Sequence, residues 1–121
     1  MLTIRDTQMQ AFASMLARSF EETALAHLRQ SLPEACAEIG ETAVRQSIRL
    51  AVRKCAQYQF DTVSETLRYL NIMYWVGFDF DEDPECLWAH KILNNENLDS
   101  EEKLDALEQA ALSELAAGES S

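Results

Sequence analysis

Apolar residues recur at intervals of three and four along most of the chain, which is the spacing of an amphipathic helix. Val44, Ile48 and Val52 form one such stripe, and it predicts a helix over residues 41–57. The same spacing earlier in the chain predicts a helix over residues 8–30. No β-type alternation of useful length and no internal repeat is visible, so the pattern predicts an all-α fold.

The most apolar stretch is residues 69–78, which read YLNIMYWVGF. It overlaps a predicted helix over residues 63–76 whose second half is apolar on nearly every side, as expected of a helix at the centre of a bundle. The stretch is about half the ~20 residues that a membrane-spanning helix needs, so we expect core and no membrane partner. The side chains expected in this core are Leu67, Leu70, Met73, Tyr74 and Trp88.

Residue pairs three apart mark the predicted helix starts, because a Ser, Thr or Asp and a following Glu or Gln can each accept a hydrogen bond from the other's backbone. The pairs are Thr7 with Gln10, Ser31 with Glu34, Thr62 with Glu65 and Asp99 with Glu102. Gly40 and Gly77 fit helix ends. These signals predict a compact single-domain bundle of five or six helices over residues 1–116, with a frayed tail over residues 117–121.

Size and composition fit one domain, since the chain has 121 residues and is 47% hydrophobic. The first residues lack the features of a secretory signal, so we expect a cytoplasmic protein. Three cysteines, Cys36, Cys55 and Cys86, follow no metal or disulfide spacing and stand in apolar helical contexts. We expect them to be reduced thiols in the core.

Charge is distributed unevenly, and this narrows the class of partner. Residues 1–77 hold eight acidic and eight basic residues, whereas residues 78–121 hold 13 acidic residues and two basic ones, which accounts for the net charge of −11. A negative field repels phosphate, so nucleic acid and anionic membranes are not expected partners. A basic protein surface would be attracted.

The acid-rich segment after Gly77 allows three interpretations. Asp79, Asp81 and Asp83 match the first three ligand positions of an EF-hand loop, but a proline stands where glycine is needed and a histidine where the bidentate glutamate is needed. Alternatively, Asp83 caps a helix that begins at Pro84, Phe78 and Phe80 anchor the loop, and the other acids face water. In the third interpretation the acids form a docking surface for a basic partner. Its candidate residues are Asp79, Asp81, Glu82 and Glu85.

Other chemistry has little support. Cys86 and His90 lie four apart and could supply two zinc ligands, but the remaining ligands have no clear candidates. No glycine-rich phosphate loop, nucleophile turn or His-Glu metal motif occurs, and the chain has two histidines. We therefore expect no metal, no cofactor and no enzymatic activity.

Two helical faces are further candidates for partner binding. Arg45, Arg49 and Arg53 form a basic ridge, which either pairs with acids on neighbouring helices or meets a carboxylate surface of a partner. In the last predicted helix Leu104, Leu107 and Leu115 share a face, which either completes the core or docks on a partner. The same stripe would allow a homodimer.

Several blocks of the sequence together carry a resemblance. They are Ile4-Arg5 with Gln8-Met9, His27-Leu28 before Leu32-Pro33 and Cys36, Arg68-Tyr69-Leu70 with Met73 and Gly77, Asp79-Phe80-Asp81, Asp83-Pro84, Trp88-Ala89 and Ile92-Leu93. The chain resembles small uncharacterised helical bacterial proteins encoded beside type VI secretion effector genes, near the spike, PAAR-tip and adaptor proteins. The likeness covers roughly residues 4–107 and is most specific over residues 68–93. One departure is Gln59, where a glycine is expected after the tyrosine.

The resemblance implies a cytoplasmic accessory role, as an adaptor, chaperone or co-chaperone for a type VI secretion effector. An immunity protein that binds and neutralises a toxin is the alternative, and a homo-oligomeric structural protein is a second one. No catalytic residues carry over from this group. A chaperone should present an exposed apolar patch with a polar rim, whereas an immunity protein more often presents charge matched to an active site.

Overall fold

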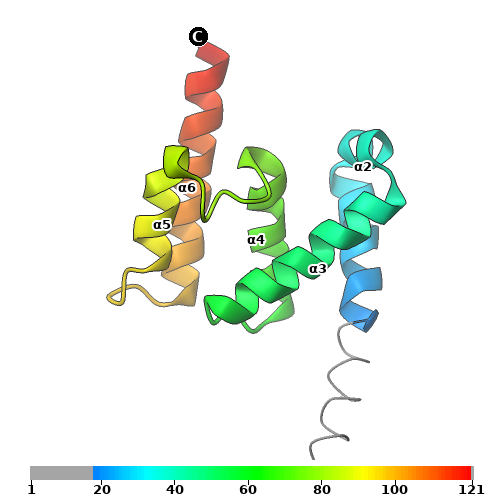
Figure 1. Cartoon of the computed structure of the whole chain (residues 1–121), viewed down its shortest axis with the longest axis horizontal. Coiled ribbons are helices and arrows are strands. Elements are labelled where there is room, and N and C mark those ends of the chain that lie inside the picture. The colour runs from blue at the N-terminus through cyan, green and yellow to red at the C-terminus, as the bar shows by residue number, and fades with distance from the viewer. Residues whose placement is uncertain (1–17, 121) are drawn as a thin grey trace, which may run out of the picture. The chain divides into compact units, whose positions relative to one another are not determined.

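The computed structural model describes residues 18–120, with side chains described up to residue 116, and its regular elements are all helices. The helices are residues 18–31, α2 (Pro33–Ile39), α3 (Glu41–Gln57), α4 (Val63–Val76), the 3-10 turn η1 (Pro84–Cys86), α5 (Leu87–Leu93) and α6 (Ser100–Ser120) (Figure 1). No strand occurs in this part of the chain, which confirms the all-α prediction. The predicted cap at Thr7 and Gln10 lies outside the described residues.

Tertiary contacts divide the chain into two compact units, residues 1–52 and 53–121. The helix α3 is unbroken from residue 41 to residue 57 and contributes residues to both units. α6 continues through residues 117–120, where the sequence predicted a tail. The division leaves the single-domain organisation as a prediction.

In the first unit, the helix over residues 18–31 and α3 bury small and branched apolar side chains. These are Ala24, Leu25, Leu28, Val44, Ile48 and Ala51. The predicted capping box of Ser31 and Glu34 is wrong, because Ser31 is the last residue of the preceding helix and Leu32 stands in the cap position with no side-chain cap. Pro33 does occupy the first turn of α2, and Gly40, with φ of 86°, ends it.

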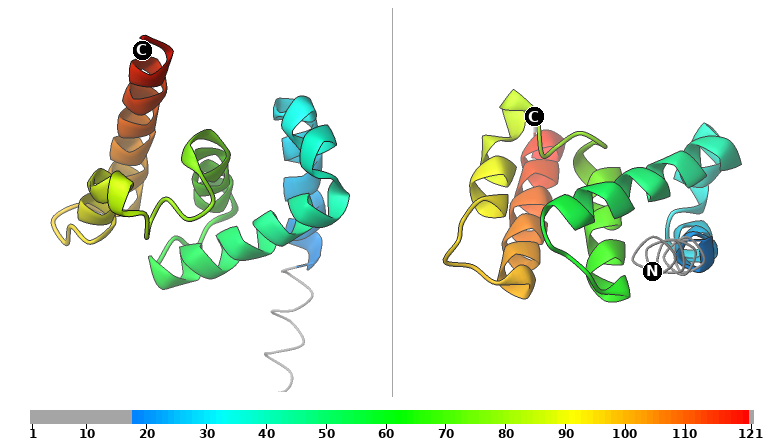
Figure 2. Two further views of the ribbon diagram at one scale, coloured as in Figure 1. Left: turned by 45° about the horizontal axis from the view of Figure 1, so that its top comes forward. Right: turned by 60° about the horizontal axis from the view of Figure 1, so that its bottom comes forward.

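In the second unit α6 packs against both α4 and α5, and it lies between them (Figure 2). The predicted bounds of α4 are confirmed, and its residues Leu70 and Met73 are fully buried, as expected. Leu67, Tyr74 and Trp88 are instead partly exposed. The remaining apolar core of this unit consists of Cys55, Phe60, Tyr69, Ile72, Phe80, Ala89, Leu93, Leu104, Leu107 and Ala111.

Two of the predicted capping boxes form as expected. The Glu65 backbone donates to Thr62 Oγ1 over 3.1 Å, and the Thr62 backbone donates to Glu65 Oε1 over 3.1 Å. Asp99 and Glu102 make the same reciprocal pair over 2.8 and 3.1 Å. Each box satisfies backbone N–H groups that have no partner inside the helix, and thereby sets where α4 and α6 begin.

Among the described helices, none is both long enough and apolar enough to cross a lipid bilayer. The three cysteines are free thiols, but Cys55 alone is fully buried, while Cys36 and Cys86 are partly exposed. Burial raises the pKa of Cys55 to about 12, with an opposing hydrogen bond from Thr66. Its thiol is therefore protonated at neutral pH and unreactive.

Candidate functional site

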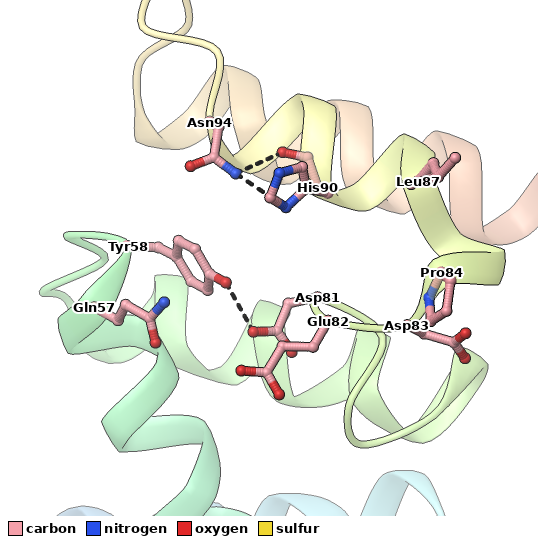
Figure 3. A pocket seen from close by; sticks show the side chains of 9 residues that line it. All are labelled: Gln57, Tyr58, Asp81, Glu82, Asp83, Pro84, Leu87, His90 and Asn94. Carbon is pink, nitrogen blue, oxygen red and sulfur yellow. Dashed lines mark hydrogen bonds between the residues drawn. The ribbon is translucent and has the colours of Figure 1, made fainter.

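The acid-rich segment after α4 forms one wall of a pocket in the second unit, with a volume of about 550 Å³ (Figure 3). The end of α3, the loop before η1 and one side of α5 contribute to it. Its lining residues are Gln57, Tyr58, Asp81, Glu82, Asp83, Pro84, Leu87, His90 and Asn94.

Asp81 is the anchor of this wall. Its Oδ2 accepts a hydrogen bond from Tyr58 Oη over 2.7 Å and lies 2.8 Å from Lys54 Nζ. The residue is 2% exposed, so the expectation that it faces water or a partner is wrong. A buried carboxylate is stable when it is paired and hydrogen-bonded, and Lys54 and Tyr58 together meet that requirement.

Phe80 explains why the loop holds Asp81 inward. Its ring is buried and lies 5.1 Å from the Tyr69 ring and 6.3 Å from the Trp88 ring, measured between centroids. Aromatic burial of this size dominates the energetics of a short loop. The anchoring role predicted for Phe80 is confirmed, and Phe78, which contacts the Tyr74 ring edge-on, is partly exposed.

Lys54 holds two carboxylates of the loop at once. Besides Asp81, it contacts Glu82 Oε1 over 3.1 Å, and Glu82 is largely exposed. Burial tends to lower the pKa of Lys54, but hydrogen bonds to Asp81 and Glu82 outweigh it and raise that pKa. Burial and the Asp81 carboxylate likewise raise the pKa of Tyr58. At neutral pH the lysine is therefore charged and the tyrosine is a neutral donor.

The other acidic residues of the segment differ in their exposure and in their hydrogen bonds. Asp83 Oδ1 accepts a hydrogen bond from the Glu85 backbone over 2.9 Å, so Asp83 caps the turn that begins at Pro84, as predicted. Asp79, Glu82 and Glu85 are exposed and remain available to a partner. Thus one of the four docking candidates named from the sequence is structural, and three stay on the surface.

A metal site does not assemble from these residues. In the part of the chain that the structure describes, no group of three His, Cys, Asp or Glu side chains is arranged to hold a metal ion. The EF-hand pattern would make Asp81 and Asp83 calcium ligands. In the structure Asp81 instead pairs with Lys54, and Asp83 caps a turn. On α5, His90 hydrogen-bonds with Asn94 rather than with Cys86.

Sequence reasoning missed Lys54 and Tyr58 as members of this site. Neither residue belongs to the basic ridge of Arg45, Arg49 and Arg53 or to the acid-rich segment, which are the groups that composition singles out. One signal was present: the two residues lie four apart at the end of a predicted helix, which places them on one face. Nothing in the sequence indicates that this face meets a loop more than twenty residues later.

No family model, curated protein or solved structure matches this chain.

The arginine ridge of α3 is largely neutralised within the first unit. Arg45 contacts Glu21 and Glu22 over 2.7 and 2.8 Å, and Arg49 contacts Glu21 over 2.7 Å. Hydrogen bonds from Arg49 and Arg45 lower the pKa of Glu21. These two arginines are therefore paired with acids on a neighbouring helix, as the first alternative expects, and their role in partner binding stays a prediction.

Arg53, the third member of the ridge, belongs to the second unit. It is exposed, and it makes no ion pair with any residue that the structure describes. A single exposed arginine is an ordinary surface feature and carries no argument for a basic ridge.

The leucine stripe of α6 has two parts. Leu104 and Leu107 are fully buried with Ala111, so the docking role considered for these two leucines is wrong, and they complete the core. Leu115 is 39% exposed and the adjacent Leu112 is 51% exposed. In Figure 1 the C-terminal turns of α6 extend beyond α4 and α5, which explains why the same face is covered first and uncovered later.

Proposed function

We propose that this chain is a cytoplasmic protein-binding accessory factor, an adaptor, chaperone or co-chaperone for a type VI secretion effector. The observation that carries the binding role is the pair of exposed leucines, Leu112 and Leu115, at the end of α6. They follow Leu104 and Leu107, which are buried in the core. The last turns of α6 therefore keep the apolar residues of a buried helix, although no described part of the chain covers them.

A third exposed leucine occurs in the same unit. Leu87, the first residue of α5, is 59% exposed. α5 packs against α6, so Leu87 and the two exposed leucines of α6 lie on neighbouring helices. Exposed apolar side chains rimmed by polar residues are typical of a protein-docking surface.

The type VI secretion context comes from the resemblance, whose most specific part, residues 68–93, includes most of α4 and the acid-rich wall of the pocket. The proposal assigns no catalytic step, metal or cofactor to the chain. In this proposal the binding energy comes mainly from apolar side chains that the partner buries when it docks. The exposed acidic residues around them set the orientation of the partner.

Co-expression with the effector, spike and adaptor proteins encoded nearest to its gene tests the proposal. A tagged chain should co-purify one of them, and Leu112→Gln with Leu115→Gln should abolish that co-purification, because Gln keeps helix propensity and removes apolar area. The matched control is Val63→Gln, which removes another exposed apolar side chain of the same unit. Equal loss in the control, or no effect of the leucine changes, would contradict the proposal.

The immunity alternative is favoured by charge. Residues 53–121 contain fifteen acidic and five basic residues, a net charge of −10, which would steer the unit toward a basic active site. Neutralising Asp79, Glu82 and Glu85 should then slow association and abolish protection of cells from a co-expressed neighbouring toxin. For an adaptor the neutralised variant should bind nearly as well. Asp81 and Asp83 stay unchanged in this test because they are structural.

A further inference from the structure

Arg68 fixes how α4 and α6 lie against each other. Its guanidinium contacts the carboxylates of Asp105 and Glu108 on α6, each over 2.6 Å. The two helices pack together and run in the same direction along the second unit (Figure 1). Both continue beyond these ion pairs, so positions further along them can be matched from the regular rise of about 1.5 Å per residue.

Two helical turns beyond the ion pairs, the matched positions are apolar. Trp75 follows Arg68 by seven residues, and Leu112 and Leu115 follow its two carboxylate partners by seven residues each. Seven residues return to nearly the same face of a helix, so Trp75 lies beside the two leucines as Arg68 lies beside the two carboxylates. Both leucines are exposed and Trp75 is partly exposed. An uncovered apolar face therefore joins the ends of α4 and α6.

Within the unit, helices cover the neighbouring part of this face. Leu104, Leu107 and Ala111 are buried where α6 packs against α4 and α5. Leu115 comes four residues after Ala111 and so continues the same row of side chains. Such a row suits a further helix at its uncovered end, because apolar side chains three and four apart interlock with side chains of the same spacing on a partner.

The sequence around this face is acidic. Residues 104–121 contain four acidic residues and no basic one, and residues 69–76 contain no charged residue. Arg68, the only basic residue of α4, is already shared between two carboxylates. A second copy of the chain would bring acids against acids, and these three side chains supply less than the roughly 800 Å² per partner that a standard interface buries. The charge is complementary to a segment that carries Lys or Arg beside its apolar residues.

We propose that the face formed by Trp75, Leu112 and Leu115 binds a basic amphipathic helix of the partner protein. Apolar residues of that helix, three and four apart, pack on the tryptophan and the leucines. Its Lys and Arg side chains meet the exposed Glu114 and the carboxylates beside Arg68. This inference rests on the proposed function in that the helix belongs to a bound protein, and it adds the chemistry of the segment that is recognised.

A titration with synthetic peptides tests this face without any effector. The probe is an acetylated and amidated peptide of Leu, Ala and Lys, with Leu three and four positions apart and Lys flanking the leucine face. It is added to the whole chain carrying Trp88→Phe, in which Trp75 is the only tryptophan. Burial of Trp75 should shift its fluorescence saturably to shorter wavelength. Two control peptides, one with the same composition in shuffled order and one with Glu in place of Lys, should each bind at least about tenfold more weakly.

Protein variants locate the binding. Leu112→Gln with Leu115→Gln should weaken binding of the Lys peptide about tenfold, because it removes exposed apolar contacts and leaves every charge in place. The matched control, Val63→Gln, changes an exposed apolar residue at the opposite end of α4 and should alter binding less than about twofold. Glu114→Gln should weaken binding about twofold at low salt and less at high salt, as expected of a charge at the rim.

Three outcomes overturn the assignment. They are equal binding of either control peptide, equal loss in the Val63→Gln control, and a dimer of the chain that forms at the titration concentration and is lost in the variant with both leucines replaced, as sedimentation would detect. The peptides contain no effector sequence, so a failed titration alongside leucine-dependent co-purification overturns the basic helix and leaves the adaptor proposal standing. Saturable, leucine-dependent peptide binding without any co-purified protein overturns the adaptor proposal alone.

Discussion

Asp81 shows that a residue's neighbours in space decide its role. Five acids lie within residues 79–85, and by composition they are interchangeable. Yet Asp81 is buried against Lys54 and Tyr58, Asp83 caps a turn, and Asp79 and Glu85 face solvent. The pairing at Asp81 joins the end of α3 to the loop after α4 and so shapes the floor of the pocket.

Replacing Asp81 by Asn should therefore destabilise the protein by about 3 kcal/mol, because Lys54 would remain buried with one exposed carboxylate as its partner. Guanidinium unfolding followed by circular dichroism measures the change. Asp79→Asn removes an exposed acid two residues away and should alter stability by less than about 0.5 kcal/mol. Equal effects of the two substitutions would mean that the buried pair does not form in solution.

Single elements follow local rules closely in this protein. α4 begins at a capping box and ends at Gly77, whose φ of 130° suits glycine, and its bounds match those expected from the sequence. A capping box and a helix stop involve residues no more than four apart, so they are visible without tertiary structure. The failure at Ser31 has a local cause too, because the preceding helix continues through that residue.

The Glu65 carboxylate makes the start of α4 sensitive to pH. Burial tends to raise the pKa of Glu65, but hydrogen bonds from the Thr62 side chain and from the Thr62 and Asp61 backbones outweigh it and lower that pKa. A group whose folded pKa lies below its unfolded value of about 4.3 stabilises the fold above pH 4.3, and the contribution is lost as pH falls through the folded pKa.

Glu65→Gln should consequently be less stable than the wild-type chain at pH 6, with the difference shrinking as the pH falls below the unfolded value of about 4.3 and through the folded pKa. Urea unfolding across that range measures it. Taking the difference between the two proteins removes the general effect of titrating the other acids, provided that these titrate alike in both. A difference that stays constant with pH would show that the Glu65 charge contributes nothing to the box.

Packing of α4 gives a second prediction for this element. Leu70 is fully buried, and Leu70→Ala should cost ~2–5 kcal/mol in the free energy of unfolding, because it removes transfer energy and leaves a cavity. Val63, on the same helix, is exposed, and Val63→Ala should cost less than about 0.5 kcal/mol. A near-zero change at Leu70 would place that side chain on a surface and contradict the packing against α6.

For the whole molecule, the open question is whether residues 1–116 unfold as one domain, as the sequence predicts, or as the two units that the contacts define. α3 runs unbroken through residue 52, so one hydrogen-bonded helix is shared by both units. Both tryptophans, Trp75 and Trp88, lie in the second unit, whereas helical circular dichroism reports on the first unit as well.

We expect thermal unfolding followed by tryptophan fluorescence and by circular dichroism at 222 nm to give the same midpoint, because a shared helix couples the two units. Replacing Leu70 by Ala should then lower both midpoints together. Two separate midpoints, with the tryptophan transition alone responding to Leu70→Ala, would show that the chain consists of two independently unfolding units.

The sequence by itself determined the helical class, the bounds of α3 and α4, and the caps of α4, η1 and α6, since periodicity and capping depend on residues within about one or two helical turns. It did not determine which acid of the loop is buried, which leucines of α6 are core, or that Lys54 faces Asp81. Those outcomes depend on contacts between helices and loops that are separate along the chain. Burial is decided where elements meet, and an apolar or acidic residue looks the same in sequence whether or not another element covers it.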